Sequence, residues 1–202
     1  MMKKIQFGII LVSTLSLFSG GHATSNSQGW QLNLAQSTGS VRFLAVGRPS
    51  FLKIRGEGPA PEGNMFIRGN SVTGIVSFNL ASLGTGIKMR DEHMKQKYLE
   101  VQKFPKAELK ITKIDLPASL WTSQDAAFED ITYEGTLSLH GVQKVVSGLA
   151  KIERHENVLN VGSQFKIKLK DFNVEIPSFK GITVSEDVDV SVSFSAPFEN
   201  KK

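Results

Sequence analysis

Apolar and polar residues alternate along most of this chain, which is the pattern of β-strands with one dry and one wet face. The alternation is clearest over residues 131–139, where Ile131, Tyr133, Leu137 and Leu139 are separated by polar or small residues. Comparable segments lie at 30–34, 41–45, 52–54, 65–67, 72–80, 107–114, 145–152, 165–169 and 188–194. The chain therefore predicts about eight to ten strands.

The alternation is interrupted once, between residues 84 and 111. Two glycines there favour an exit from the preceding strand, because glycine adopts backbone angles that other residues resist. A short helix is predicted to begin near Arg90 and to end before Pro105, since a proline disfavours helical geometry in the residue before it. Its apolar stripe, at i, i+4 and i+7, consists of Met94, Tyr98 and Val101.

Two further segments are predicted to be loops. Residues 56–63 are rich in glycine and proline, which indicates a flexible tip without chemistry. Residues 115–130 carry Trp121 and Phe128, which either plug the end of a barrel or anchor the loop, and we favour anchoring. The predicted hairpin turns are Gly69–Asn70 and His140–Gly141.

So many short amphipathic strands in one domain form either a sandwich or a closed barrel. Lysine and glutamate on alternate positions indicate a wet exterior, so a membrane-spanning barrel is disfavoured. The interior of an eight-stranded barrel is either filled by side chains or holds one ligand. Thirteen Phe against two Tyr and two Trp suit an apolar guest, although the residues alone favour an ordinary filled core.

The first residues predict a signal peptide at 1–23. Lys3 and Lys4 precede an apolar run, and Ala23 ends a small-residue cleavage pattern. Residues 24–202 then form one domain, and removing the two lysines lowers the net charge from +5 to +3. This charge is too small and scattered for nucleic-acid binding. The chain has no Cys, so neither a disulfide nor lipid attachment through a cysteine is available.

The sequence offers little for catalysis, and we expect no enzyme activity. It has no pair of histidines at metal-binding spacing on one helix, no nucleophile elbow and no phosphate-binding glycine loop. His93 with Asp91 and Glu92 is the best metal candidate, but neighbouring residues of a helix point in different directions. We therefore predict no metal site, and we interpret His140 and His155 as solvated loop residues.

Five stretches resemble the YceI-like family of secreted bacterial proteins: STGSVRFLAVG, TGIKMRDEHMKQKYLEVQKFPKAELKI, YEGTLSLHGVQKVVSG, FKIKLKDFNVEIPSFKG and VDVSVSFSAPF. The resemblance covers about the whole domain. It implies an antiparallel lipocalin-like closed barrel of about eight strands, with one short helix inserted, that holds an isoprenoid-type lipid. It also suggests a structural or mouth-lining role for His93 and His140, which match its RD-x-H and HG motifs.

With this resemblance, the hypothesis is a periplasmic, non-catalytic protein that sequesters or carries a polyisoprenoid or quinone-like lipid and needs no cofactor. The alternative is a periplasmic stress-protection or interaction protein with a filled barrel. Transient membrane contact and a homodimer are left open. The predicted ligand-binding residues are Phe43, Val76, Phe78, Arg90, His93, Met94, Tyr98, Leu109, Ile111, Leu137, Leu139, Phe165, Ile167, Val192 and Phe194.

Overall fold

Strands make up most of the computed structural model, which describes residues 29–48, 50–68, 71–179 and 182–201. The predicted signal peptide and the predicted turn Gly69–Asn70 lie outside these residues. The strands are β1 (Gly29–Asn33), β2 (Thr38–Arg48), β3 (Lys53–Pro59), β4 (Glu62–Arg68), β5 (Ser71–Asn79), β6 (Lys106–Ile114), β7 (Asp125–Leu139), β8 (Val142–His155), β9 (Val158–Lys168), β10 (Ser178–Phe179) and β11 (Ile182–Lys201).

Helical segments are short and lie between strands. Lys88–His93 forms α1, which continues as the π-helical segment η3 (Met94–Tyr98), and Ser119–Thr122 forms α2. The 3-10 turns are η1 (Leu34–Gln36), η2 (Leu80–Ser82) and η4 (Leu169–Phe172). None of these described helices is long and apolar enough to cross a membrane.

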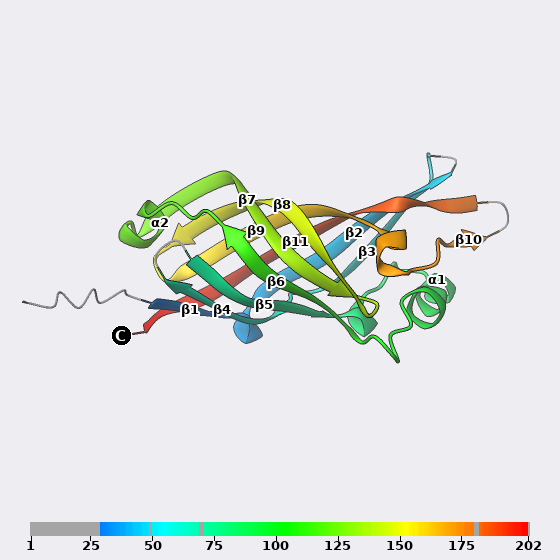
Figure 1. Ribbon diagram of the computed structural model, residues 1–202, viewed down its shortest axis with the longest axis horizontal. Helices are drawn as coiled ribbons and strands as arrows, with labels where there is room; N and C mark the ends of the chain where they lie inside the picture. The colour runs from blue at the N-terminus through cyan, green and yellow to red at the C-terminus, as the bar shows by residue number, and fades with distance from the viewer. Residues whose placement is uncertain (1–28, 49, 69–70, 180–181, 202) are drawn as a thin grey trace, which may run out of the picture.

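The sheet closes on itself as an antiparallel barrel, as predicted (Figure 1). Its closed ring runs β1-β4-β5-β6-β7-β8-β9-β11 and returns to β1, because β1 pairs with both β4 and β11. The first part of β11 pairs instead with β2, and β2 pairs with β3. The wall therefore has eight strand positions. β1 and β2 together occupy one of them, and β3 and β4 together occupy the next.

Residues 56–63 are strand rather than loop, so that prediction is wrong. β3 and β4 are separated only by Ala60 and Pro61, and Pro61 is fully buried. Gly56 and Gly58 lie within β3 and not in a turn. A Cβ at Gly56 would clash with the ring of Phe43, and a Cβ at Gly58 would clash with the ring of Phe78. These glycines make room for aromatic side chains within the wall.

The predicted helix exists, but it begins at Lys88 and widens into a π-helix after His93. The amide of Leu99 donates to the carbonyl of Met94 at 2.8 Å, which is an i to i+5 bond. The predicted stripe of Met94, Tyr98 and Val101 packs against a cluster of buried side chains inside the barrel.

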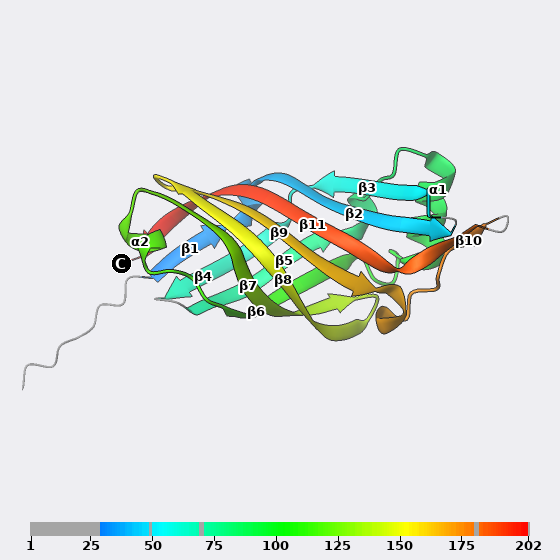
Figure 2. The same ribbon diagram turned by 90° about the horizontal axis from the view of Figure 1, so that it is seen from above.

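The two ends of the barrel differ (Figure 2). α1 and the turn between β2 and β3 lie at one end, and α2 lies with β1 and the C-terminus at the other. The interior forms two buried clusters. One includes Leu120 and Phe198 and lies at the α2 end, and the other includes Phe78 and Phe172.

Candidate ligand-binding site

An apolar cavity of about 630 Å³ occupies the barrel interior. Its volume is within the range of ligand-binding cavities. The filled barrel, which the residues alone favour, is therefore not what the structure shows. All the side chains that the sequence nominated lie along the cavity wall: Phe43, Val76, Phe78, Arg90, His93, Met94, Tyr98, Leu109, Ile111, Leu137, Leu139, Phe165, Ile167, Val192 and Phe194.

Arg90, His93, Met94 and Tyr98 come from α1 and η3, and alternation places the other residues on the inner face of the wall. Phe165 of β9 lies opposite Val190 of β11, and both line the cavity. The neighbours Gln164 and Lys166 are exposed, because successive side chains of a strand point to opposite faces. The same rule points to lining residues that were not nominated: Leu32, Val41, Ala45, Ile54, Val72, Val161, Val188 and Val190.

Other lining residues come from loops and short helices, and no periodicity identifies them. Leu116, Leu120 and Trp121 belong to the segment around α2. Residues 115–130 were predicted to be one loop, but they contain α2, and β7 already begins at Asp125. The segment closes one end of the cavity and Trp121 lines it, so Trp121 is part of a plug and does not only anchor a loop, the role expected from the sequence. Phe128 lies in β7 and does not line the cavity.

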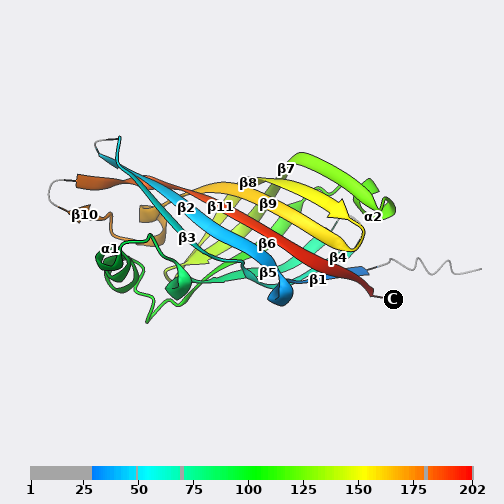
Figure 3. The same cartoon turned by 180° about the vertical axis from the view of Figure 1, so that it is seen from behind.

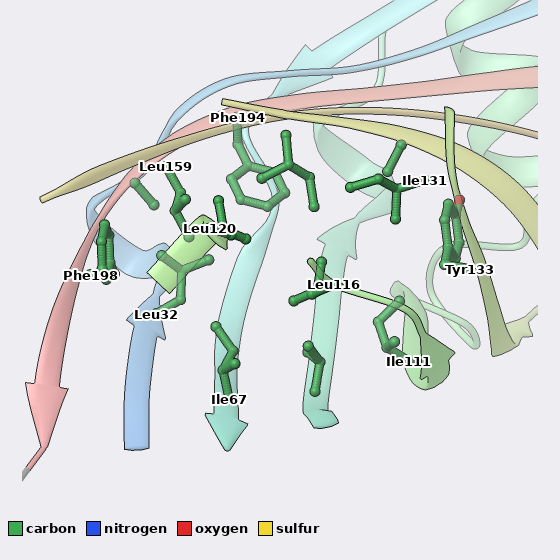
Figure 4. Close-up of a cluster of buried hydrophobic side chains, with 14 of the residues drawn as sticks. Leu32, Ile67, Ile111, Leu116, Leu120, Ile131, Tyr133, Leu159, Phe194 and Phe198 are labelled. Atoms are coloured by element: carbon green, nitrogen blue, oxygen red, sulfur yellow. The ribbon is translucent and has the colours of Figure 1, made fainter. Parts of the chain in front are cut away.

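The plug is packed tightly. Leu120 has no exposed surface and lies among Leu32, Leu159 and Phe198 (Figure 4). Trp121 stacks on Trp30 with a distance of 6.0 Å between the ring centroids.

Buried Arg154 ties the plug to the barrel. Its Nη1 donates to the carbonyl of Leu120 at 2.9 Å, and its guanidinium lies 4.9 Å from the ring centroid of Phe198. Arg154 therefore makes a hydrogen bond to the plug and a cation–π interaction with the barrel. They hold α2 across the end of the barrel.

The opposite end is the mouth, where the cavity wall becomes polar. Arg90 donates to Thr85 twice, from Nε to the hydroxyl at 2.8 Å and from Nη2 to the carbonyl at 3.0 Å. The carboxylate of Asp91 accepts from the backbone N–H of Thr85 at 2.7 Å and from its hydroxyl. These bonds fix the loop before α1, which carries Thr85, and leave other guanidinium N–H groups of Arg90 available.

Asp91 is held in its charged form. Burial opposes its ionisation, but the two hydrogen bonds from Thr85 and the charges of Lys95 and Arg90 outweigh burial and lower the pKa of Asp91. Its carboxylate is thus engaged by Thr85 in the loop before α1. Within the described ranges, no group of three or more His, Asp or Glu side chains is placed to hold a metal ion.

His140 is not the solvated loop residue that the sequence suggested. Its side chain is only 9% exposed, its Nε2 lies 3.0 Å from a carboxylate oxygen of Glu100, and its Nδ1 lies 3.1 Å from the carbonyl of Phe172. Its ring also packs against Phe104. Hydrogen bonds from Lys103 and then from His140 lower the pKa of Glu100. His140 therefore ties the β7–β8 turn to the segment after η3 and to η4. His155, by contrast, is exposed as predicted and pairs with Asp125, although it is the last residue of β8 and not a loop residue.

One polar pair interrupts the apolar wall. The hydroxyls of Tyr133 and Ser163 lie 2.7 Å apart, and burial raises the pKa of Tyr133. Both residues line the cavity. Neutral hydroxyls that bond to each other are compatible with an apolar interior, because neither is left without a partner.

A closed antiparallel barrel with one plugged end, one polar mouth and an apolar cavity defines a lipocalin-like binding fold. The chain belongs to the YceI-like family, because the model of the YceI-like domain matches residues 30–196. No curated protein sequence matches it significantly.

Solved structures show the same fold. A polyisoprenoid-binding domain from Saccharophagus degradans has 17% identity and a TM-score of 0.59, and the alignment covers 83% of this chain and 97% of that one. BcnA of Burkholderia cenocepacia has 17% identity and a TM-score of 0.61, with 82% and 99% covered. The YceI protein of Campylobacter jejuni has 19% identity and a TM-score of 0.52, with 74% and 85% covered.

Proposed function

We propose that this protein binds one long apolar lipid, a polyisoprenoid or a quinone-like molecule, in its barrel cavity and sequesters or carries it without catalysis. The observation that carries the proposal is the cavity itself, which is closed by α2 at one end and lined almost entirely by apolar side chains. The description of the Saccharophagus degradans domain as polyisoprenoid-binding supports this ligand class.

The free energy gained by filling the cavity supports the same conclusion. The side chains that line it are almost all apolar, and each Å² of apolar surface that a ligand removes from water contributes about 25 cal/mol. An apolar ligand therefore gains about 0.8 kcal/mol for each methylene that it buries.

The two ends set the orientation of the ligand. The apolar tail points toward Leu120 and Trp121, because that end is closed and apolar. The head group lies at the mouth near Arg90 and His93, where hydrogen-bond donors line the wall. Burial of the tail is nondirectional, so cavity length limits the tail while the mouth discriminates among head groups.

We further propose that the protein works in the periplasm after removal of residues 1–23. Support for this comes from the basic start, the apolar run and the small-residue pattern at Ala23. A carrier there would shield an apolar lipid from water between membranes.

Native mass spectrometry of protein purified from its own periplasm without detergent, followed by organic extraction, tests the proposal. We expect a bound mass of several hundred daltons with an isoprenoid pattern. A ligand-free protein that also refuses added quinones and polyprenols would contradict it, and its loops would then become the functional surface.

A further inference from the structure

Three exposed apolar side chains lie at the mouth end of the barrel. Phe51, in the turn between β2 and β3, is 83% exposed, and Met89 and Ile87 at the start of α1 are 63% and 53% exposed. The turn and α1 lie at the same end of the barrel (Figure 3). Apolar surface of this kind, rimmed by polar residues, marks a binding surface.

This surface is continuous with the cavity. Ile87 and Met89 line the cavity as well as facing solvent, and Leu52, next to Phe51, is also a lining residue. A partner that covers the mouth therefore meets apolar side chains that continue into the barrel beside the polar ones. The other large exposed apolar side chains lie on the outer faces of β4, β5, β8 and β9 and do not line the cavity: Phe66, Ile75, Val145, Leu149 and Val158.

The two segments that carry the exposed apolar residues are mainly basic, although one of their lysines, Lys97, pairs with Glu175. The two segments that carry the exposed apolar residues, 48–53 and 87–98, contain six basic and two acidic residues. Lys53 and Lys88 are exposed, and neither forms an ion pair within the part of the chain that the structure describes. Asp91, one of the two acids, turns toward Thr85.

We propose that this mouth surface, made of Phe51, Ile87, Met89, Lys53 and Lys88, docks onto a membrane that contains anionic lipids, and that the ligand passes through it. The inference rests on the proposed lipid-carrying function and names the surface that exchanges the lipid. Apolar side chains enter the interface between head groups and acyl chains, while the lysines meet anionic head groups. The mouth then opens directly onto the acyl chains.

Flotation with phosphatidylcholine vesicles, with and without phosphatidylglycerol, tests the docking. We expect the protein to float with the anionic vesicles. Phe51→Ser should lower the vesicle partition coefficient by about tenfold, because one aromatic side chain no longer leaves water. Lys53→Gln with Lys88→Gln should lower it by about fivefold for each lysine, with a reduced salt dependence.

Matched controls exist on the barrel wall. Phe66 on β4 is 47% exposed, and Lys113 on β6 is exposed, so Phe66→Ser and Lys113→Gln remove the same kinds of side chain away from the mouth. We expect both to float like the original protein. Equal losses for Phe51→Ser and Phe66→Ser would overturn the proposal, as would a dimer that Phe51→Ser dissociates without any vesicle binding.

Failure of the docking surface is distinguishable from failure of the lipid-binding proposal. Phe51 does not line the cavity, so Phe51→Ser should bind a short polyprenol in vesicle-free solution as the original protein does. Lipid binding without flotation overturns the docking surface alone. Flotation that Phe51→Ser abolishes, in a protein that takes up no lipid, supports the surface and contradicts the lipid-carrying function.

Discussion

Gly56 and Gly58 show how single residues shape the cavity. Each occupies a place in β3 where a Cβ would collide with an aromatic ring, that of Phe43 for Gly56 and that of Phe78 for Gly58. The missing side chains let the two rings lie against the strand in the cavity wall. Glycines that looked like turn residues in the sequence therefore determine the shape of the binding site.

A charge on the cavity wall should weaken lipid binding strongly. Phe165→Asp would place a carboxylate where the ligand tail passes, and an unpaired charge in apolar surroundings costs several kcal/mol. We expect lipid affinity to fall by at least about tenfold in a fluorescence titration, with the circular dichroism spectrum unchanged. The exposed neighbour supplies the control, since Gln164→Asp should bind lipid normally. Normal uptake by folded Phe165→Asp would remove Phe165 from the binding site.

His93 lies at the mouth, so its removal should affect the head group and not the tail. We expect His93→Ala to narrow the difference in affinity between quinones and polyprenols of equal length, because a hydrogen-bonding ring is lost from the mouth. The dependence of affinity on tail length should stay the same. Competition titrations with both ligand series measure the two effects, and equal losses for all head groups would place His93 outside the head-group site.

Among the elements, α2 is the one that converts an open tube into a closed cavity. Leu120 is fully buried, and Leu120→Ala should lower the free energy of unfolding by about 2–5 kcal/mol, because it leaves a hole in the plug. Urea denaturation measures this change. The exposed neighbour Ser119 gives the control, since Ser119→Ala should have little effect. A decrease of much less than about 2 kcal/mol for Leu120→Ala would mean that α2 shifts to fill the space left by the side chain.

The stability of the segment after η3 depends on the charge of Glu100. Its pKa is lowered by hydrogen bonds from Lys103 and His140, so the charged form is favoured in the folded state. The unfolded chain therefore binds more protons just below the ordinary pKa of Glu100, and stability falls as the pH drops through that range. Above the range, the contribution of Glu100 is fully present.

Glu100→Gln tests this pH dependence. The difference in the free energy of unfolding between the original protein and the variant should be largest near neutral pH and should shrink as the pH falls below about 4.5. Urea denaturation at several pH values measures it. Glu62→Gln, at an exposed position, is the control. A constant difference across the pH range would show that the charge of Glu100 does not stabilise the segment.

At the scale of the whole molecule, we expect the bound ligand to increase the free energy of unfolding. A ligand at about 100 times its Kd adds about 2.7 kcal/mol to the free energy of unfolding, which raises the Tm of a protein of this size by about 5–10 °C. Delipidated protein should therefore melt that much lower and recover when a polyprenol is added. Phe165→Asp should show no recovery, and recovery in that variant would point to lipid binding outside the cavity.

Much of the site was predictable because every strand of a closed barrel turns one face toward a single interior. Strict alternation over β7 and β9 was enough to assign Leu137, Leu139, Phe165 and Ile167 to one face, and closure makes that face the cavity wall. The plug was not predictable from alternation, because α2 has only one turn and its role depends on distant strands. The burial of His140 was missed for the same reason, since its partners Glu100 and Phe172 are far away in the sequence.

The sequence by itself determined most of the strands, their inner faces and the helix that follows β5, because these follow from local periodicity and backbone preference. Tertiary structure alone decided that the barrel encloses a cavity and does not fill. It also decided which end is plugged and that Phe51, Ile87 and Met89 lie at the same, open end. The physical reason is that interior volume and end closure arise from contacts between segments distant in the chain, on which the pattern of neighbouring residues carries no information.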